Sequence, residues 1–189
     1  MDVIAIGGSA GALEVVLALM RDLPESFEIP VVVVMHLPPT PPSMLPTLLA
    51  NATKHSVYEI EDKQPLVAGA IYVAPPNYHV LIERERTFSL SVDAPVNYSR
   101  PSIDVLFESA SAFGASAAGV VLSGANDDGA RGLAQIVAAG GIGIVQDPET
   151  AAYPTMPLAA VRLVGSRARI VLPGDIAGAL AALSGRHLQ

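Results

Sequence analysis

A set of almost uninterrupted apolar runs constrains the fold of this chain more than any other feature of its sequence. Runs without polar alternation are typical of strands covered on both faces, as parallel strands are between two layers of helices. The composition, 51% hydrophobic and only 15% charged, fits such buried strands. The runs are Val3 to Ile6, Val31 to Met35, Ala118 to Leu122 and Ile142 to Val145, and shorter strands are expected at Tyr58 to Ile60, Gly69 to Ala74 and Ala168 to Val171.

Segments with helical periodicity separate these strands. The alternation predicts an α/β fold of the Rossmann-like, doubly wound type, in which a mainly parallel sheet has helices on both faces. An antiparallel hairpin from Val80 to Val92, turning at Arg84-Glu85-Arg86, is expected to be attached to that sheet. The expected helices are Leu13 to Met20, Pro42 to Ala50, Ile103 to Ala110 with Ser102 as its N-cap, Leu133 to Val137, Met156 to Val164 and Ile176 to Leu183.

Length and composition exclude several classes of function. The 189 residues suit one domain, 1–189, that needs no metal or disulfide to stabilise it. The chain has no cysteine and only four scattered histidines, so we expect neither a thiol nucleophile nor a metal site. A net charge of −7 argues against a nucleic-acid partner. No signal peptide and no apolar run of about 18 residues is found, which argues against membrane insertion.

The turn after the first strand is the first candidate for chemistry. It reads Gly7-Gly8-Ser9-Ala10-Gly11 and fits the spacing G-x-S-x-G, in which a sharp strand-to-helix turn exposes a serine hydroxyl. Ser9 is therefore a candidate nucleophile. Two other interpretations remain open at this point, because serine is a preferred helix N-cap and because a glycine-rich turn before a helix can bind phosphate or a nucleotide.

A histidine and an aspartate follow other strands directly, which is where ligands bind in an open parallel sheet. His36 ends the run Val31 to Met35, and Asp128 lies in the polar turn after Leu122. Serine esterases need a histidine base and a carboxylate that orients it, so Ser9, His36 and Asp128 form a candidate triad. Taken singly, His36 could be a hydrogen-bonded strand-end residue and Asp128 the N-cap of the following helix. His79 is an alternative base.

Several motifs together resemble the protein-glutamate methylesterases of bacterial chemotaxis, the CheB catalytic domain. The resemblance implies a cytoplasmic hydrolase that removes methyl groups from glutamate methyl esters of chemoreceptors, releases methanol, often deamidates receptor glutamines and needs no cofactor. It also implies Ser9 as nucleophile, His36 as base and Asp128 as orienting acid. The motifs are IGGSAGA from Ile6, VVVVMHLPP from Val31, YVAPPNYHV from Tyr72, RPSIDVLF from Arg100, LSGANDDGARG from Leu122 and AGGIGIVQD from Ala139.

Three departures from the family pattern bear on activity. Ala10 replaces the usual threonine after the nucleophile, and Ala125-Asn126 replaces a usual Met-Gly pair, so the oxyanion would depend on the backbone N–H groups of Ala10 and Ala125. The chain also begins at the catalytic domain without a receiver domain, as a fragment or a stand-alone homologue would. A separate response regulator or methyltransferase is then an expected partner. The alternative function is a catalytically weakened or inactive domain that acts as a signalling or partner-binding module.

Overall fold

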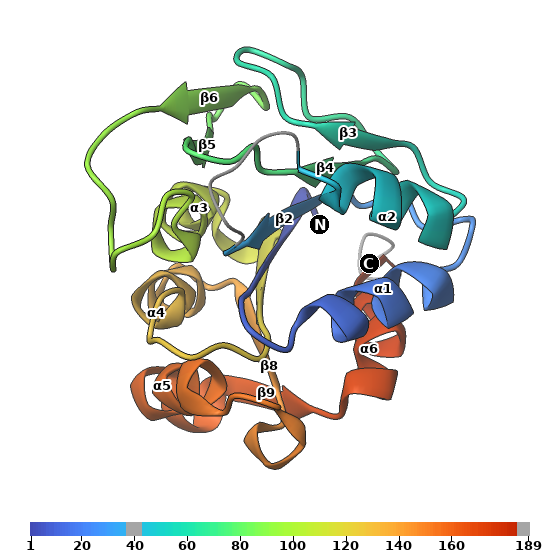
Figure 1. The fold of residues 1–189 in the computed structure, drawn as a ribbon. Helices are drawn as coiled ribbons and strands as arrows, with labels where there is room; N and C mark the ends of the chain where they lie inside the picture. The colour runs from blue at the N-terminus through green and yellow to red at the C-terminus, as the bar shows by residue number, and fades with distance from the viewer. Residues whose placement is uncertain (37–42, 185–189) are drawn as a thin grey trace.

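A single parallel sheet forms the centre of the computed structural model, which describes residues 1–36 and 43–184 (Figure 1). The sheet has seven strands, and every hydrogen-bonded pair in it is parallel. In their order across the sheet the strands are β3 (Val57–Glu59), β4 (Ile71–Val73), β2 (Val31–Met35), β1 (Val3–Gly8), β7 (Ala117–Val121), β8 (Ile142–Gln146) and β9 (Ala168–Val171).

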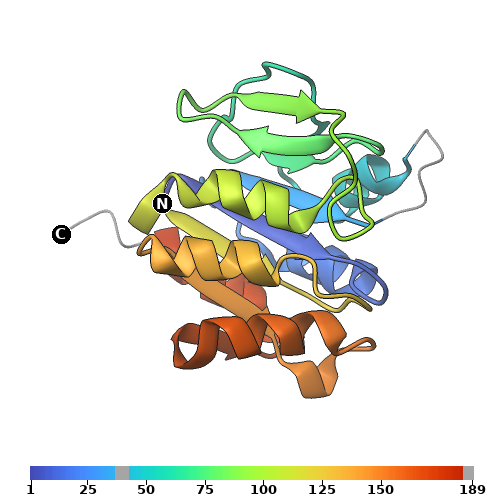
Figure 2. The same ribbon diagram turned by 90° about the vertical axis from the view of Figure 1, so that its left-hand side faces the viewer.

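Helices cover both faces of the sheet, as the continuous apolar runs predict. On β1, Val3 and Ala5 lie in one buried cluster, and Ile4 and Ile6 lie in another on the opposite face. The first cluster is closed by α3 (Ile103–Ser111), α4 (Ala130–Ala138) and α5 (Thr155–Val164), which lie side by side in Figure 2. The second is closed by α1 (Leu13–Asp22), α2 (Leu45–Ala52) and α6 (Ile176–Ser184).

The predicted elements are present with shifts of a few residues at their ends. The short strand expected at Tyr58 to Ile60 is Val57–Glu59, and the start of the helix expected at Pro42 lies outside the described residues. Short 3₁₀ helices also occur at Gly114–Ser116, Pro148–Thr150, Gly165–Arg167 and Pro173–Asp175. Within residues 1–36 and 43–184, no helix is long and apolar enough to cross a bilayer.

The predicted antiparallel hairpin is present, but it is not attached to the main sheet as expected. Strands β5 (His79–Ile82) and β6 (Phe88–Ser91) pair antiparallel, but they form a separate two-stranded sheet and do not extend the main one. The physical reason is that β4, which precedes the hairpin, already pairs with β2 on one side and β3 on the other. The hairpin instead buries Val80, Ile82 and Phe88 in the cluster beside α3.

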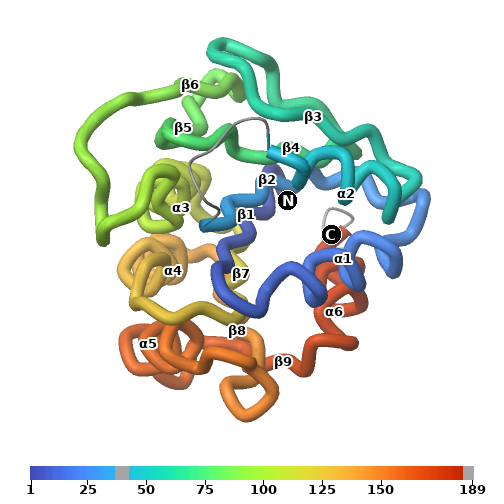
Figure 3. The backbone as a smooth tube through the Cα atoms, in the orientation of Figure 1, coloured from blue at the N-terminus to red at the C-terminus, as the bar shows by residue number. Residues whose placement is uncertain are grey.

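The central position of β1 determines which loops meet at the edge of the sheet. β1 lies between β2 and β7, with parallel register on both sides, so the carboxyl ends of the three strands lie together (Figure 3). Ser9, His36 and the turn from Ser123 to Gly129 follow these three ends. The fold therefore brings the predicted site residues to one edge.

Candidate active site

Ser9 lies in a tight turn between β1 and α1 and does not cap the helix. The N-cap of α1 is Ala12, and no side chain caps that end of the helix. The turn is closed by the Ala12 N–H, which donates to the Ser9 carbonyl at 3.0 Å, and Gly11 adopts a φ of 77° that favours glycine. The capping interpretation of Ser9 is therefore wrong, and its side chain has no hydrogen-bond partner among the described residues.

Ser123, which follows β7, holds the Ser9 turn in place. The Ser9 N–H donates to the Ser123 carbonyl at 2.9 Å, and the Ser123 hydroxyl donates to the Ala10 carbonyl at 2.8 Å. The N–H of Ser123 donates in turn to the buried Gln146 side chain at 2.9 Å. Because the N–H groups of Ser9 and Ala12 already donate to the carbonyls of Ser123 and Ser9, a phosphate bound at the turn would lack two of its donors.

His36 follows β2 directly beside Ser9. Gly8 pairs with Met35 in the β1–β2 register, and the His36 N–H donates to the Gly8 carbonyl at 3.1 Å. Ser9 and His36 are thus the next residues of two adjacent strands. This backbone arrangement brings the candidate nucleophile and the candidate base to neighbouring positions at the sheet edge.

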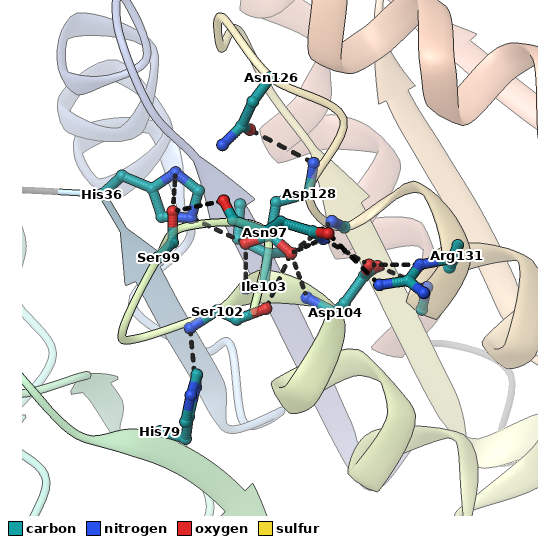
Figure 4. Close-up of polar contacts among 12 residues, drawn as sticks. His36, His79, Asn97, Ser99, Ser102, Ile103, Asp104, Asn126, Asp128 and Arg131 are labelled. Atoms are coloured by element: carbon teal, nitrogen blue, oxygen red, sulfur yellow. Dashed lines mark hydrogen bonds and ion pairs between the residues drawn. The ribbon is translucent and has the colours of Figure 1, made fainter. Parts of the chain in front are cut away.

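Asp128, and not the adjacent Asp127, contacts His36 (Figure 4). The His36 Nε2 lies 2.8 Å from the Asp128 Oδ2, and the Asp128 side chain is fully buried, whereas 12% of the His36 side chain is exposed. Asp127 is exposed. The predicted contact between Asp128 and a His36 ring nitrogen is therefore confirmed.

The Asp128 carboxylate also caps α3, which sequence reasoning did not foresee. Its oxygens accept the N–H groups of Ile103 and Asp104, at 2.7 and 3.0 Å, in the first turn of that helix. The alternative interpretation made Asp128 the N-cap of the following helix α4, but the N-cap there is Gly129, and no side chain caps α4. Asp128 therefore connects the start of α3 to the candidate base.

Ser102 also differs from its predicted role. It occupies the N-cap position of α3, but its hydroxyl makes no capping hydrogen bond and instead donates to the Asp128 Oδ1 at 2.8 Å. The buried aspartate from a distant loop has taken over the cap, because its carboxylate accepts helix N–H groups more strongly than a neutral hydroxyl does.

Burial would raise the pKa of the Asp128 carboxyl, but hydrogen bonds from His36, Ile103, Asp104 and Ser102 outweigh it and hold the pKa below the usual value of 3.8. The folded state thus binds this proton less readily than the unfolded state. The resulting stabilisation is complete above pH 3.8 and is lost as pH falls through the folded-state pKa.

We expect the difference in thermal midpoint between wild type and an Asp128→Asn variant to shrink as the pH is lowered below 3.8, because the wild-type carboxylate then loses its stabilising contribution. A calorimetric series over pH measures this difference, and a constant difference would contradict the prediction.

A second buried carboxylate supports the first through an asparagine. The Asn97 Nδ2 donates to both Asp128 Oδ1 and Asp104 Oδ2, at 3.1 and 3.0 Å. Asp104 also accepts the Arg131 Nε at 3.1 Å and the Gly132 N–H at 2.8 Å. Asn97 and Arg131 thus separate and balance two negative charges, and they attach the loop before Arg100 to the site (Figure 4).

The second ring nitrogen of His36 faces a residue that sequence reasoning missed. We predicted that this nitrogen would face Ser9, but the hydroxyl found against Nδ1, at 3.4 Å, belongs to Ser99. The same hydroxyl lies 3.4 Å from the Asn97 carbonyl, so it has an alternative acceptor. No single-sequence signal distinguishes Ser99 from an ordinary loop serine.

His79, the alternative base, is not part of the site. It is buried in β5, its Nε2 lies 3.2 Å from the Ala94 carbonyl, and its Nδ1 accepts the Ser102 N–H at 3.2 Å. Both nitrogens are occupied by backbone groups. His79 therefore connects the hairpin to the start of α3.

The backbone N–H groups of Ala10 and Ala125 have no acceptor among the described residues. Each follows a residue whose own N–H is bonded, since Ser9 donates to Ser123 and Gly124 donates to Tyr153 at 3.0 Å. The Asn126 side chain accepts the Asp128 N–H at 3.3 Å, so the residue that departs from the family pattern shapes the turn that carries the acid.

A cleft of about 330 Å³ opens beside His36. It is large enough for a few side chains of a bound segment and has walls from three parts of the chain. The described residues that line it are His36, Asn77, Pro95, Tyr98, Ser99, Arg100 and Pro101.

Comparison with known proteins agrees with this architecture. A relative in Leptospira interrogans, provisionally named a protein-glutamate methylesterase/protein-glutamine glutaminase, is 44% identical over 161 residues, which are 85% of this chain and 83% of that protein. The protein-glutamate methylesterase/protein-glutamine glutaminase of Trichodesmium erythraeum is 35% identical over 162 residues, covering 83% of this chain and 46% of the relative, so the chain spans about half of that protein.

The solved structure of the Thermotoga maritima CheB methylesterase catalytic domain superposes with a TM-score of 0.90 at 26% identity, covering 96% of this chain and 98% of that one. Its strands and helices thus follow nearly the same path as those described above. The family model described as CheB methylesterase matches residues 4–180. The chain therefore belongs to the CheB methylesterase family.

Proposed function

We propose that this chain is a serine esterase that hydrolyses glutamate methyl esters of chemoreceptor-like proteins and releases methanol. The observation that carries the proposal is the 2.8 Å contact between His36 and the fully buried Asp128, at the sheet edge where Ser9 follows the adjacent strand. A buried carboxylate that fixes one histidine nitrogen leaves the other nitrogen to act on a neighbouring hydroxyl. Glutamine deamidation follows the same route with ammonia as the leaving group.

Acylation begins with neutral His36, whose Nε2–H donates to Asp128. The Nδ1 lone pair accepts the Ser9 proton while Oγ attacks the ester carbonyl. Ser99 must first release Nδ1, and its hydroxyl hydrogen can turn to the Asn97 carbonyl without a backbone change. The N–H groups of Ala10 and Ala125 then donate to the oxyanion.

Collapse of the tetrahedral intermediate expels methanol, which takes its proton from the His36 imidazolium. Water enters, loses a proton to His36 and attacks the acyl-serine. The second tetrahedral intermediate then collapses, His36 returns the proton to the departing Ser9 Oγ, and glutamate is released. Asp128 remains ionised throughout, because its hydrogen bonds hold the pKa of its carboxyl below the usual value despite burial. No cofactor or metal takes part in this scheme.

The pH dependence of hydrolysis tests the role of His36. A general base must be neutral, so protonation of His36 should make the rate fall on the acid side of the profile. The measurement is kcat/KM for methanol release between about pH 5 and pH 8. A flat profile would remove His36 from the mechanism.

A covalent serine probe tests the assignment as a whole. We expect a fluorophosphonate to label the purified chain at Ser9, located by peptide mass spectrometry, and to abolish methanol release from a methylated receptor fragment in proportion to labelling. Labelling elsewhere, or activity that survives full labelling, would contradict the proposal. An inactive partner-binding module would neither label nor release methanol.

The setting of the reaction is part of the proposal. We place it in the cytoplasm, with 1–189 acting as one catalytic domain. Control by a separate response regulator, and opposition by a methyltransferase that restores the ester, are the partner relationships that this activity implies.

A further inference from the structure

Arg100 is the most unusual polar residue of the cleft beside His36. Its Nη1 donates to the carbonyls of Val92 and Asp93, at 2.7 and 3.0 Å. Its Nε is buried and has no hydrogen-bond partner, the one such side-chain atom found within the described part of the chain. Buried N–H donors are nearly always paired in folded proteins, so the guanidinium is incompletely satisfied by its own chain. Because Nε is closed off from solvent, a ligand would meet Nη2, which has no partner among the described residues.

The charge of Arg100 also lacks a counterion. No carboxylate in residues 1–36 and 43–184 forms an ion pair with its guanidinium, and the nearby Asp93 carboxylate accepts the Ser91 hydroxyl at 2.7 Å. Among the described residues that line the cleft, Arg100 alone carries a permanent charge. On a chain of net charge −7, a fixed cation beside the candidate base is a local exception.

We propose that Arg100 forms an anion subsite that binds a carboxylate of the substrate protein next to the glutamate methyl ester, so that the enzyme selects esters in acidic surroundings. The inference rests on the proposed function, because it names a specificity contact of the same cleft. Arginine presents a planar array of N–H donors that matches a carboxylate and stays charged at every working pH.

The anchoring of Arg100 suits this role. Two backbone carbonyls hold Nη1, so the guanidinium is already oriented and loses little side-chain entropy when a carboxylate binds. Arg100 follows Ser99, whose hydroxyl lies 3.4 Å from the His36 Nδ1, so the subsite is adjacent to the reacting group. A segment bound along the cleft can therefore place its ester at His36 and a neighbouring acid at Arg100.

The test compares peptides that carry one glutamate methyl ester. A single glutamate is moved along the peptide, with glutamine at the same place as the neutral partner. Wild type should prefer glutamate at one or two positions by about tenfold to a hundredfold in kcat/KM, the range of a charge-assisted hydrogen bond, mostly through KM. The preference should weaken with added salt.

Variants separate recognition from support of the loop. Arg100→Gln should abolish the preference, Arg100→Lys should keep part of it, and Arg100→Glu should favour lysine at the same position. The matched control is Arg84→Gln, an identical charge change in the exposed turn of the hairpin, which should leave the preference intact. Equal loss for acidic and neutral peptides in Arg100→Gln would mean that Arg100 only supports the loop, and would overturn the proposal.

Two further measurements keep the outcomes distinct. Wild-type hydrolysis of acidic and neutral peptides at equal rates overturns the subsite but leaves the esterase proposal standing. Anisotropy titrations of the same peptides with Ser9→Ala report binding without turnover: an Arg100-dependent preference for acidic peptides there, with no hydrolysis by wild type, would support the subsite and contradict the esterase. If Arg100→Gln does not fold, two measurements still test the subsite. These are the preference of Arg100→Lys for acidic peptides compared with wild type, and the salt dependence of the wild-type preference.

Discussion

Replacing Ser9 with alanine is expected to reduce ester hydrolysis by roughly 10⁴- to 10⁶-fold, the usual effect of removing the nucleophile of a triad. The fold should be unaffected, because the change removes one hydroxyl that has no partner among the described residues and the turn is held by backbone contacts to Ser123. Methanol release from methylated receptor measures the first effect, and the thermal midpoint, expected within a few degrees of wild type, measures the second.

A matched control for Ser9 is Ser99→Ala. Ser99 presents a hydroxyl near the His36 imidazole, at 3.4 Å from Nδ1. If Ser9 is the nucleophile, the Ser99 variant should keep activity within about tenfold of wild type, because only a weak contact is lost. If Ser9→Ala were fully active and Ser99→Ala inactive, Ser99 and not Ser9 would be the nucleophile.

Replacing Asp128 with asparagine should damage both turnover and stability. Turnover should fall by roughly 10²- to 10⁴-fold, because the amide no longer fixes the histidine tautomer. Stability should fall because Oδ1 accepts four hydrogen bonds and Oδ2 accepts two, so an NH₂ group at either position would face donors. An unsatisfied buried group costs about 1–3 kcal/mol, or a drop in thermal midpoint of roughly 2 to 10 °C.

The control for Asp128 is its neighbour Asp127. It is exposed, its carbonyl closes a turn with the Ala130 N–H, and its substitution by asparagine should change turnover by less than about tenfold and leave the thermal midpoint unchanged. Comparison of the two variants by steady-state kinetics and calorimetry separates the buried acid from a general effect of charge in this turn. Equal losses in both would contradict the assignment.

Most of the fold could be predicted because its signals are local. The continuous runs at Val31–Met35 and Ala117–Val121 have no polar face, so they require cover on both sides. The hairpin was predicted, but its attachment to the main sheet was wrong, because alternation predicts pairing within β5 and β6 and carries no information on what lies beyond them. Whether β4 has a free edge depends on β3, a three-residue strand with weak sequence signal.

Only the site residues that directly follow strands could be predicted from the sequence. His36 and Asp128 follow strands, so parallel topology brings them together. The role of Asp128 at the start of α3 could not be foreseen, because its partners Ile103 and Asp104 lie more than twenty positions away and donate backbone N–H groups that any residue would supply. Ser99 and Arg100 belong to a loop whose course depends on these same contacts.

The contacts of Asp128 with both His36 and the start of α3 restrict which substitutions this position can accept during evolution. The carboxylate that we propose orients the base also caps the start of a core helix, so a lineage that abandons the proposed hydrolysis cannot discard the acid without weakening that helix. Ser9 has no such second duty. In descendants that keep the fold for another purpose, the nucleophile should therefore decay first, and a surviving aspartate at this position would be evidence of a stable domain and not of a working enzyme.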